Sequence, residues 1–249
     1  FSTTPIEGQK PGTSGLRKKT RAFMAPHYLE NFVQATFDAI GGGAGKQLIL
    51  GGDGRFFNAA AIQTILKMAA ANGVVRVIVG QGGILSTPAA SHLIRLNGFD
   101  GGFILSASHN PGGIDADFGI KFNGQNGGPA TEGVTQKIFE ATLSITQYAR
   151  LEAADVDLDR TGTTTLGGMT VDIVDPVQDY LALMTQLFDF DAMRALFAGG
   201  FTMRFDAMHA VTGPYAVEIL QNTLGADKGS VINAIPLPDF GGGHPDPNP

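Results

Sequence analysis

The sequence predicts an α/β fold, built as layered α/β sandwich domains with mixed sheets. Short apolar runs rich in β-branched residues alternate with longer segments in which apolar residues recur at helical spacing. Turns separate these segments, and 35 of the 249 residues are glycine. Because strands that alternate with helices bury their apolar faces by stacking, this alternation indicates sheets covered by layers of helices.

The alternation is clearest over the first part of the chain. Apolar residues over 28–40 recur at helical spacing. Asn58 can cap a second helix, and Gly73 ends it. A third helix is predicted to begin at Thr87-Pro88, and strands are predicted at 47–50, 74–79 and 99–105.

Beyond residue 105 the pattern continues with one interruption. Residues 150–170 lose the periodicity and collect threonine and glycine, so a loop-rich stretch is predicted there. The second series of elements resembles the first, so we predict a first domain over residues 1–172 and a second over residues 173–249. The remaining predicted elements are strands at 118–122, 201–205 and 231–235, and helices at 131–146, from Asp175 and at 214–224.

Composition excludes several classes of protein. A net charge of -6 and a pI near 5.3 disfavour a general nucleic-acid binder, whereas a small phosphorylated ligand needs only a local basic pocket. Without cysteine there is no disulfide framework and no thiolate metal site. No signal segment or long apolar span is present, so we expect a cytoplasmic protein that does not bind membranes. No pattern in the sequence indicates an oligomeric state.

A hydroxyl at the end of a predicted strand is the main candidate for chemistry. Ser108 follows the strand at 99–105 and precedes His109, Asn110 and two glycines. Such a turn lets a ligand approach closely, so Ser108 suits a group that carries a phosphoryl. A purely structural turn is the alternative. A serine-hydrolase elbow is disfavoured, because it needs glycines where Ser106 and Asn110 stand.

The N-terminal segment 8–19 combines hydroxyls, glycines and four cations. Backbone amides and an arginine fork make a good cradle for an oxyanion. A solvated basic arm is the alternative. Candidate phosphate-binding or substrate-binding residues are therefore Thr13, Ser14 and Arg17, together with Asn110 of the serine loop.

Several segments resemble one enzyme family, the α-D-phosphohexomutases. Residues 106–113, Ser-Ala-Ser-His-Asn-Pro-Gly-Gly, are similar to the phosphoserine loop of that family. Residues 12–19, Gly-Thr-Ser-Gly-Leu-Arg-Lys-Lys, resemble its opening motif. Both segments are more similar to the glucose-phosphate branch than to the phosphomannomutase branch. Four further segments resemble the family and follow its order, at 51–56, 117–123, 174–180 and 239–248.

The resemblance implies repeated phosphohexomutase-type domains around a cleft, and interconversion of glucose 1-phosphate and glucose 6-phosphate. Ser108 would carry the phosphoryl, with glucose 1,6-bisphosphate as the intermediate. Mg²⁺, bound to Ser108 through its phosphate, and the cation of Arg17 would neutralise charge. His109 and Lys121 would move the hydroxyl protons. Taken without the resemblance, a turn histidine and an exposed strand lysine are the simpler interpretations of these two residues.

The sequence departs from the family pattern at the metal loop. It contains no Asp-Gly-Asp, so the aspartate ligands of the family are absent from this chain. Asp155, Asp157 and Asp159 alternate, but the apolar residues between them predict a half-buried strand in place of a metal loop. We therefore interpret the chain as an N-terminal portion of such an enzyme, and expect residues 1–249 alone to have negligible activity.

Two other functions share these motifs. One is a non-catalytic relative that bears a phosphoserine and acts in regulation or structure. The other is a mutase for a different hexose phosphate. In both mutase interpretations the expected partners are small-molecule sugar phosphates.

Overall fold

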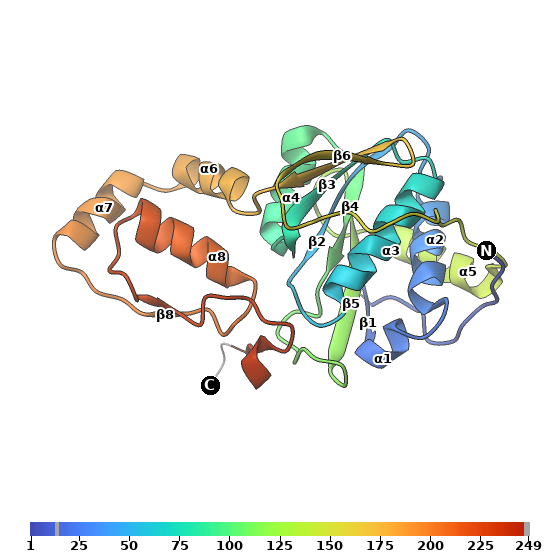
Figure 1. The fold of residues 1–249 in the computed structure, drawn as a ribbon, viewed down its shortest axis with the longest axis horizontal. Coiled ribbons are helices and arrows are strands. Elements are labelled where there is room, and N and C mark those ends of the chain that lie inside the picture. The colour runs from blue at the N-terminus through green and yellow to red at the C-terminus, as the bar shows by residue number, and fades with distance from the viewer. Residues whose placement is uncertain (13–14, 247–249) are drawn as a thin grey trace.

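A mixed sheet forms the centre of the larger part of this computed structural model (Figure 1). The structure describes residues 1–12 and 15–246. Among these, the sheet contains β1 (Leu16–Lys19), β2 (Gln47–Gly52), β3 (Arg76–Ile84), β4 (Gly101–Leu105), β5 (Asp117–Gly124), β6 (Gly162–Leu166) and β7 (Met169–Val174). The order is β1-β5-β4-β2-β3-β7-β6. β2, β3, β4 and β7 are parallel, and β5, β1 and β6 pair antiparallel with β4, β5 and β7.

The central parallel strands are apolar on both faces. In β2, Leu48 belongs to the core on one side of the sheet and Ile49 to the core on the other. In β4, Phe103 belongs to the same core as Leu48, and Ile104 belongs to the same core as Ile49. Since successive side chains of a strand point to opposite faces, a strand buried on both sides reads as a continuous apolar run.

Helices cover both faces of the sheet. Residues of α2 (Tyr28–Ala39), α3 (Asn58–Ala71) and α5 (Glu132–Ser144) belong to one core, and residues of α4 (Thr87–Asn97) belong to the other. The short α1 (Thr20–Phe23) precedes α2. The result is a three-layer α/β/α arrangement around a mixed sheet, as the sequence predicts.

A second, smaller unit lies at one end of the sheet (Figure 1). Its elements are α6 (Gln178–Leu187), α7 (Phe190–Ala198), β8 (Phe205–Asp206), α8 (Thr212–Ala216), the π-helix η1 (Val217–Thr223), β9 (Val231–Ile232) and the 3-10 helix η2 (Phe240–Gly242). β8 and β9 are parallel. The unit is joined to α4 through Tyr215, whose buried hydroxyl accepts the N–H of Ser86 at 3.0 Å. Burial raises the pKa of Tyr215.

The loop-rich stretch predicted over 150–170 is wrong in its second half, where β6 and β7 form a hairpin. Gly167 and Gly168 at its turn have φ of 57° and 87°. Two consecutive residues at positive φ are typical of the tight turns that match the twist of a hairpin. Threonine is common in strands as well as in loops, so the composition of residues 163–165 does not distinguish a strand from a loop.

The half-buried strand predicted around Val156 and Leu158 is also wrong. This segment pairs with no strand among the described residues, although Val156 and Leu158 pack against the core. The Gln63 side chain accepts the N–H of Val156 at 2.9 Å and donates to its carbonyl at 2.8 Å. One side-chain amide therefore satisfies backbone groups that a neighbouring strand would otherwise bind.

The cap predicted at Asn58 is wrong as well. Phe57, at a φ of 76°, precedes α3, and Asn58 is its first residue. The Asn58 amide donates to the Gly83 carbonyl at 3.2 Å, so this side chain ties α3 to β3 and leaves the helix terminus uncapped by a side chain.

The division into domains at residues 172 and 173 stays a prediction. β7 ends at Val174, just beyond that boundary, and the small unit follows it. Among the described residues, no helix has the length and apolar character needed to cross a bilayer.

Candidate active site

Ser108 is exposed in the loop between β4 and β5, and its backbone is left-handed with a φ of 57°. Its N–H donates to the Ser106 hydroxyl at 3.0 Å. A left-handed conformation costs a residue other than glycine roughly 1 kcal/mol. Such a conformation persists only where surrounding contacts fix it.

The guanidinium of Arg55 supplies those contacts from beneath the loop. Its Nη2 donates to the Ser108 carbonyl at 2.9 Å, and its Nη1 donates to the carbonyls of Asn110 at 3.3 Å and Asp117 at 2.7 Å. Its Nε lies 3.0 Å from both carboxylate oxygens of Asp53. The Arg55 side chain is 0% exposed. One buried side chain therefore binds the middle and the end of the serine loop.

Gly119 of β5 lets the beginning of the loop lie directly on the sheet. The Ser106 N–H donates to the Gly119 carbonyl at 2.9 Å. A Cβ added at Gly119 would lie only 2.2 Å from the Ser106 carbonyl oxygen. Gly119 is also the register partner of Arg17 in β1, and Lys121 lies two residues further along β5. Directly opposed and alternate residues share one face, so Arg17 and Lys121 lie on the side where the serine loop passes.

Arg17 reaches the loop through Asn110. Its Nη1 lies 3.4 Å from Asn110 Oδ1, and the Asn110 amide donates to Asp117 at 2.8 Å. Lys19 forms an ion pair with Asp117 at 2.8 Å. Burial alone would raise the pKa of Asp117, but the hydrogen bonds from Lys19 and Asn110 hold it below its usual range. Asp117 therefore stays charged and orients Asn110 beneath Arg17.

Lys121 is a partly buried amine on the same face. Burial lowers its pKa from the ordinary 10.5, the negative charge of Asp53 opposes that shift, and the positive charge of Arg17 adds to it. These effects show that the Lys121 amine lies within electrostatic range of Arg17 and Asp53. A lysine with a lowered pKa exchanges its proton more readily near neutral pH than an ordinary one.

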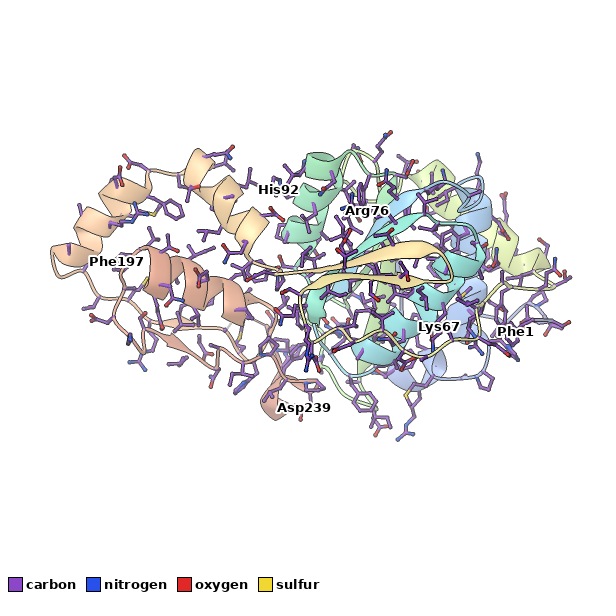
Figure 2. All side chains as sticks on the ribbon, turned by 45° about the horizontal axis from the view of Figure 1, so that its top comes forward. Phe1, Lys67, Arg76, His92, Phe197 and Asp239 are labelled. Carbon is purple, nitrogen blue, oxygen red and sulfur yellow. The ribbon has the colours of Figure 1, made fainter. Side chains whose placement is uncertain are left out.

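His109 is exposed next to the second unit. Its ring lies edge-on to that of His244, with centroids 6.3 Å apart. The segment before His244 packs on the serine loop, because a Cβ added at Gly112 would lie 2.8 Å from the Pro238 carbonyl oxygen and 2.9 Å from the Phe240 ring. Asp239 marks this junction in Figure 2.

The remaining candidate residues include two hydroxyls of the N-terminal segment and the alternating aspartates. Thr13 and Ser14 lie outside the described residues. Asp155 forms an ion pair with Lys67, and Asp157 lies 3.9 Å from Arg160, so these carboxylates have cationic partners within the chain. No group of three or more histidine, aspartate or glutamate side chains in the described part of the chain could hold a metal ion.

A large cavity among the described residues, of about 1040 Å³, lies elsewhere, between the two units. Its lining is mostly apolar and contains three carboxylates, those of Asp159, Asp175 and Glu218. Arg55 is its sole lysine or arginine, and that side chain is already bonded to Asp53 and the serine loop. A phosphorylated ligand needs free cations and donors, so the face with Arg17 and Lys121 suits it better than this cavity.

Comparison with protein families matches residues 8–149 to the family described as phosphoglucomutase/phosphomannomutase, alpha/beta/alpha domain I. That match covers more than half of the chain and includes Arg17, Ser108 and Lys121. The chain belongs to the phosphoglucomutase/phosphomannomutase family.

Individual relatives agree with this family assignment. The chain is 59% identical over 248 residues to a phosphoglucomutase of Rhizobium radiobacter, covering 100% of this chain and 46% of the relative. It is 53% identical over 249 residues to a phosphoglucomutase of Schizosaccharomyces pombe, covering 99% and 45%. The chain thus spans about half the length of the curated relatives it matches. Similar relatives include proteins named cytoplasmic and proteins named chloroplastic.

Solved structures show the same fold. The exocytosis-sensitive phosphoprotein pp63/parafusin of Paramecium, a phosphoglucomutase crystallised in an open form, superposes with a TM-score of 0.95 at 47% identity. The superposition covers 100% of this chain and 47% of that one. The family fold predicted from the sequence motifs is therefore confirmed.

In this family member, Gly119→Ala is expected to lower the free energy of unfolding by about 1–3 kcal/mol, since the new methyl collides with the Ser106 carbonyl and the backbone must shift. Chemical denaturation measures this change. Gly133→Ala is the matched control, because a Cβ there meets no atom within 4 Å at the start of α5. It is expected to leave stability unchanged or raise it by up to about 1 kcal/mol. Equal stability of the two variants would contradict the close packing described for Gly119.

Lys121→Met is expected to preserve or raise the unfolding temperature, because a partly buried charge is replaced by an apolar side chain of similar length. The sign of the pH dependence follows from the lowered pKa. Unfolded Lys121 binds its proton more tightly than folded Lys121, so the cost of the charge is fully present below the folded pKa and disappears as the pH rises toward the unfolded value. Melting curves at several pH values should therefore show the advantage of the variant shrinking with rising pH. An advantage that grows with pH would contradict this assignment.

Several residues that build the site carry no assigned role in the sequence analysis. Asp53 and Arg55 stand in the motif at 51–56, but their roles depend on carbonyls contributed by the serine loop about fifty residues later. Phe240 lies in another motif, and its ring lies over the Arg55 guanidinium and close to Gly112 of the same loop. The available signal in the sequence was that Asp53 and Arg55 stand close together at a glycine-rich strand end. If such a charged pair is buried, it needs several hydrogen-bond partners.

Proposed function

We propose that the full-length protein is a phosphoglucomutase, which interconverts glucose 1-phosphate and glucose 6-phosphate through a phosphorylated Ser108. One observation carries this proposal: the Ser108 loop is held by a buried arginine on the sheet face where Arg17 and Lys121 lie. The high sequence identity of the chain to proteins named phosphoglucomutase supports glucose phosphates as substrates.

The charge of a phosphoserine explains the cations. A phosphate monoester carries about -1.5 to -2 charges at neutral pH. Arg17 offers a planar fork of N–H donors, and Lys121 adds a second positive charge nearby. Asn110, held by Asp117, supports the position of Arg17. These groups would stabilise negative charge as the phosphoryl leaves Ser108. Thr13 and Ser14 are proposed to add phosphate-binding hydroxyls.

The proposed reaction balances in atoms and protons. The 6-hydroxyl oxygen of glucose 1-phosphate forms a bond to the phosphorus of phosphoserine, the bond from Ser108 Oγ to phosphorus breaks, the hydroxyl proton passes to a base, and an acid returns a proton to Ser108 Oγ. Glucose 1,6-bisphosphate then turns over in the site. Ser108 Oγ then forms a bond to the phosphorus on carbon 1 and loses its proton to the base, the bond from that phosphorus to the carbon-1 oxygen breaks, the carbon-1 oxygen takes up a proton, and glucose 6-phosphate leaves.

Lys121 and His109 are proposed to move the protons. The lowered pKa of Lys121 suits exchange with a sugar hydroxyl, and its place on the face shared with Arg17 supports this role. His109 follows Ser108 directly, but its ring lies against His244, so we assign Lys121 the main role.

Mg²⁺ is proposed as the cofactor and glucose 1,6-bisphosphate as the intermediate of the full-length protein. The described residues do not by themselves fit a complete metal site, because no three suitable ligands converge. A phosphate on Ser108 would provide one oxygen ligand. No step above depends on the metal. The protein is proposed to act in the cytoplasm on small-molecule sugar phosphates.

The test is to locate the phosphate. Purified protein, before and after incubation with glucose 1,6-bisphosphate, is analysed by intact mass and peptide mapping, and mutase turnover is assayed on the full-length protein. Phosphate on Ser108 with turnover of glucose 1-phosphate supports the proposal. Phosphate on Ser108 without turnover of any hexose phosphate supports a phosphoserine-bearing regulatory protein, a function suggested by the description of the Paramecium relative as a phosphoprotein. Faster turnover of another hexose phosphate would change the substrate.

A further inference from the structure

We propose that Arg55 is a positioning residue for phosphoryl transfer, which holds the Ser108 backbone in its left-handed conformation without touching the substrate. This inference rests on the proposed function. It assigns a task to a buried arginine that the reaction steps above do not use.

The contacts of Arg55 distinguish it from an ordinary structural arginine. Its Nη1 and Nη2 meet four carbonyls, and all four belong to the residues that carry and close the serine loop. These carbonyls are those of Ser108 at 2.9 Å, Asn110 at 3.3 Å, Pro111 at 3.5 Å and Asp117 at 2.7 Å. The bond to Ser108 acts directly on the residue with the unfavourable φ. The loop backbone therefore depends on one rigid fork of donors.

Burial determines how Arg55 acts. Its side chain is 0% exposed, and its charge is paired with Asp53. A group without solvent contact cannot bind a sugar phosphate that arrives from solvent. Any effect on transfer that depends on contact must therefore pass through the loop. Asp53 sets the direction of the fork, because its carboxylate binds Nε and Nη2 while Nη1 and Nη2 face the loop carbonyls.

The second unit completes the arrangement. The Phe240 ring lies 5.2 Å from the Arg55 guanidinium carbon, on the ring face. The preceding Pro238 carbonyl accepts the N–H of Phe56 at 2.7 Å, next to Arg55 in the chain. A ring over a guanidinium adds cation–π attraction and excludes water. The segment at 238–240 therefore supports the hold of Arg55 on the Ser108 loop.

Arg55→Lys is the decisive variant in the full-length protein. Lysine keeps the positive charge opposite Asp53 but presents a single ammonium, which cannot bond Asp53 and four carbonyls together. Arg76→Lys is the matched control, because Arg76 on β3 is 43% exposed and pairs with Asp172, away from the loop. Phe240→Leu is a second variant that leaves Arg55 in place and removes the ring above it, a ring that also lies close to Gly112 of the serine loop.

Three measurements are made on each protein. Hydrogen–deuterium exchange reports the loop peptide at 106–117, with a β2 peptide as internal reference. Intact mass follows phosphorylation of Ser108 by glucose 1,6-bisphosphate. Steady-state kinetics give kcat and KM for glucose 1-phosphate. In Arg55→Lys, the loop peptide is expected to exchange hydrogen for deuterium at least about tenfold faster than in wild type. Its kcat is expected to fall about 10- to 100-fold, with KM within about twofold of wild type. Phe240→Leu is expected to change loop exchange and kcat in the same direction but by less. Arg76→Lys is expected to change neither of them.

Specific results would overturn the proposal. One is unchanged loop exchange in both Arg55→Lys and Phe240→Leu. Another is faster loop exchange with unaltered kcat and unaltered Ser108 phosphorylation. A rise in KM without a fall in kcat also contradicts a residue that never meets substrate. If wild-type Ser108 takes up no phosphate, the proposed mutase function is wrong, and so is the catalytic task of Arg55. The exchange data still report in that case whether Arg55 holds the loop.

Discussion

Ser108→Ala is expected to lower mutase activity of the full-length protein by at least about 10⁴-fold and to prevent phosphate uptake at this position. The reason is chemical: the Ser108 hydroxyl is the proposed acceptor and donor of the phosphoryl, and removing a covalent nucleophile leaves only the contribution of binding and electrostatics. Coupled assays for glucose 6-phosphate and intact-mass measurements after incubation with glucose 1,6-bisphosphate give the two readouts.

Two further variants separate chemistry from stability in this experiment. Ser108→Gly also removes the hydroxyl, but relieves the cost of a left-handed residue at a φ of 57°. It is expected to be equally inactive and to unfold at the same or slightly higher denaturant concentration. Ser144→Ala, near the end of α5, is the matched serine control and should retain full activity. Mutase activity near the wild-type level in Ser108→Ala would end the phosphoserine proposal.

Asp53→Ala is expected to produce a large loss of stability, about 3–5 kcal/mol in the free energy of unfolding. The carboxylate is the ion-pair partner of Arg55, whose side chain is 0% exposed. Without Asp53 the guanidinium keeps its bonds to the loop carbonyls but remains a buried charge without its directly bonded carboxylate. Denaturant titration followed by circular dichroism measures the change.

Asp191→Ala is the control for this experiment. Asp191 pairs with Arg194 on α7 at 2.8 Å, and the Asp191 side chain is 95% exposed. Solvent screens such a pair, so its loss is expected to leave the denaturation midpoint close to that of wild type. If Asp53→Ala proved no more destabilising than Asp191→Ala, the buried pair would not be the support of the loop that the geometry indicates.

The sequence was sufficient to predict the layered fold because the central strands are buried on both faces. Runs such as that around Ile49 leave no polar positions, and the helices between them show clear apolar faces. The strand that leads into Ser108 was predicted correctly, and the sharp turn after it follows from its glycine and proline content. Proximity of Arg17 to this loop came from family resemblance, since nothing local relates residue 17 to residue 108.

The missed features depend on partners distant in the sequence. The hairpin of β6 and β7 has threonines and paired glycines that suit a loop equally well, and only pairing of β7 with β3 fixes it. Val156 satisfies its backbone through the side chain of Gln63, which periodicity cannot reveal. The sequence analysis assigns no role to Arg55, and its burial becomes evident only when the loop carbonyls are placed around it.

The strand that supplies Arg17 is also the outer edge of the sheet, since β1 pairs only with β5 among the described strands. Its three exposed residues, Arg17, Lys18 and Lys19, are all cations. An open edge offers unpaired backbone groups to any other extended chain, and a row of cations repels the same edge of a second copy. The arginine that we propose to bind phosphate would thus also protect the molecule against pairing of two such edges, whereas the opposite border at β6, with exposed threonines and no charge, lacks this protection.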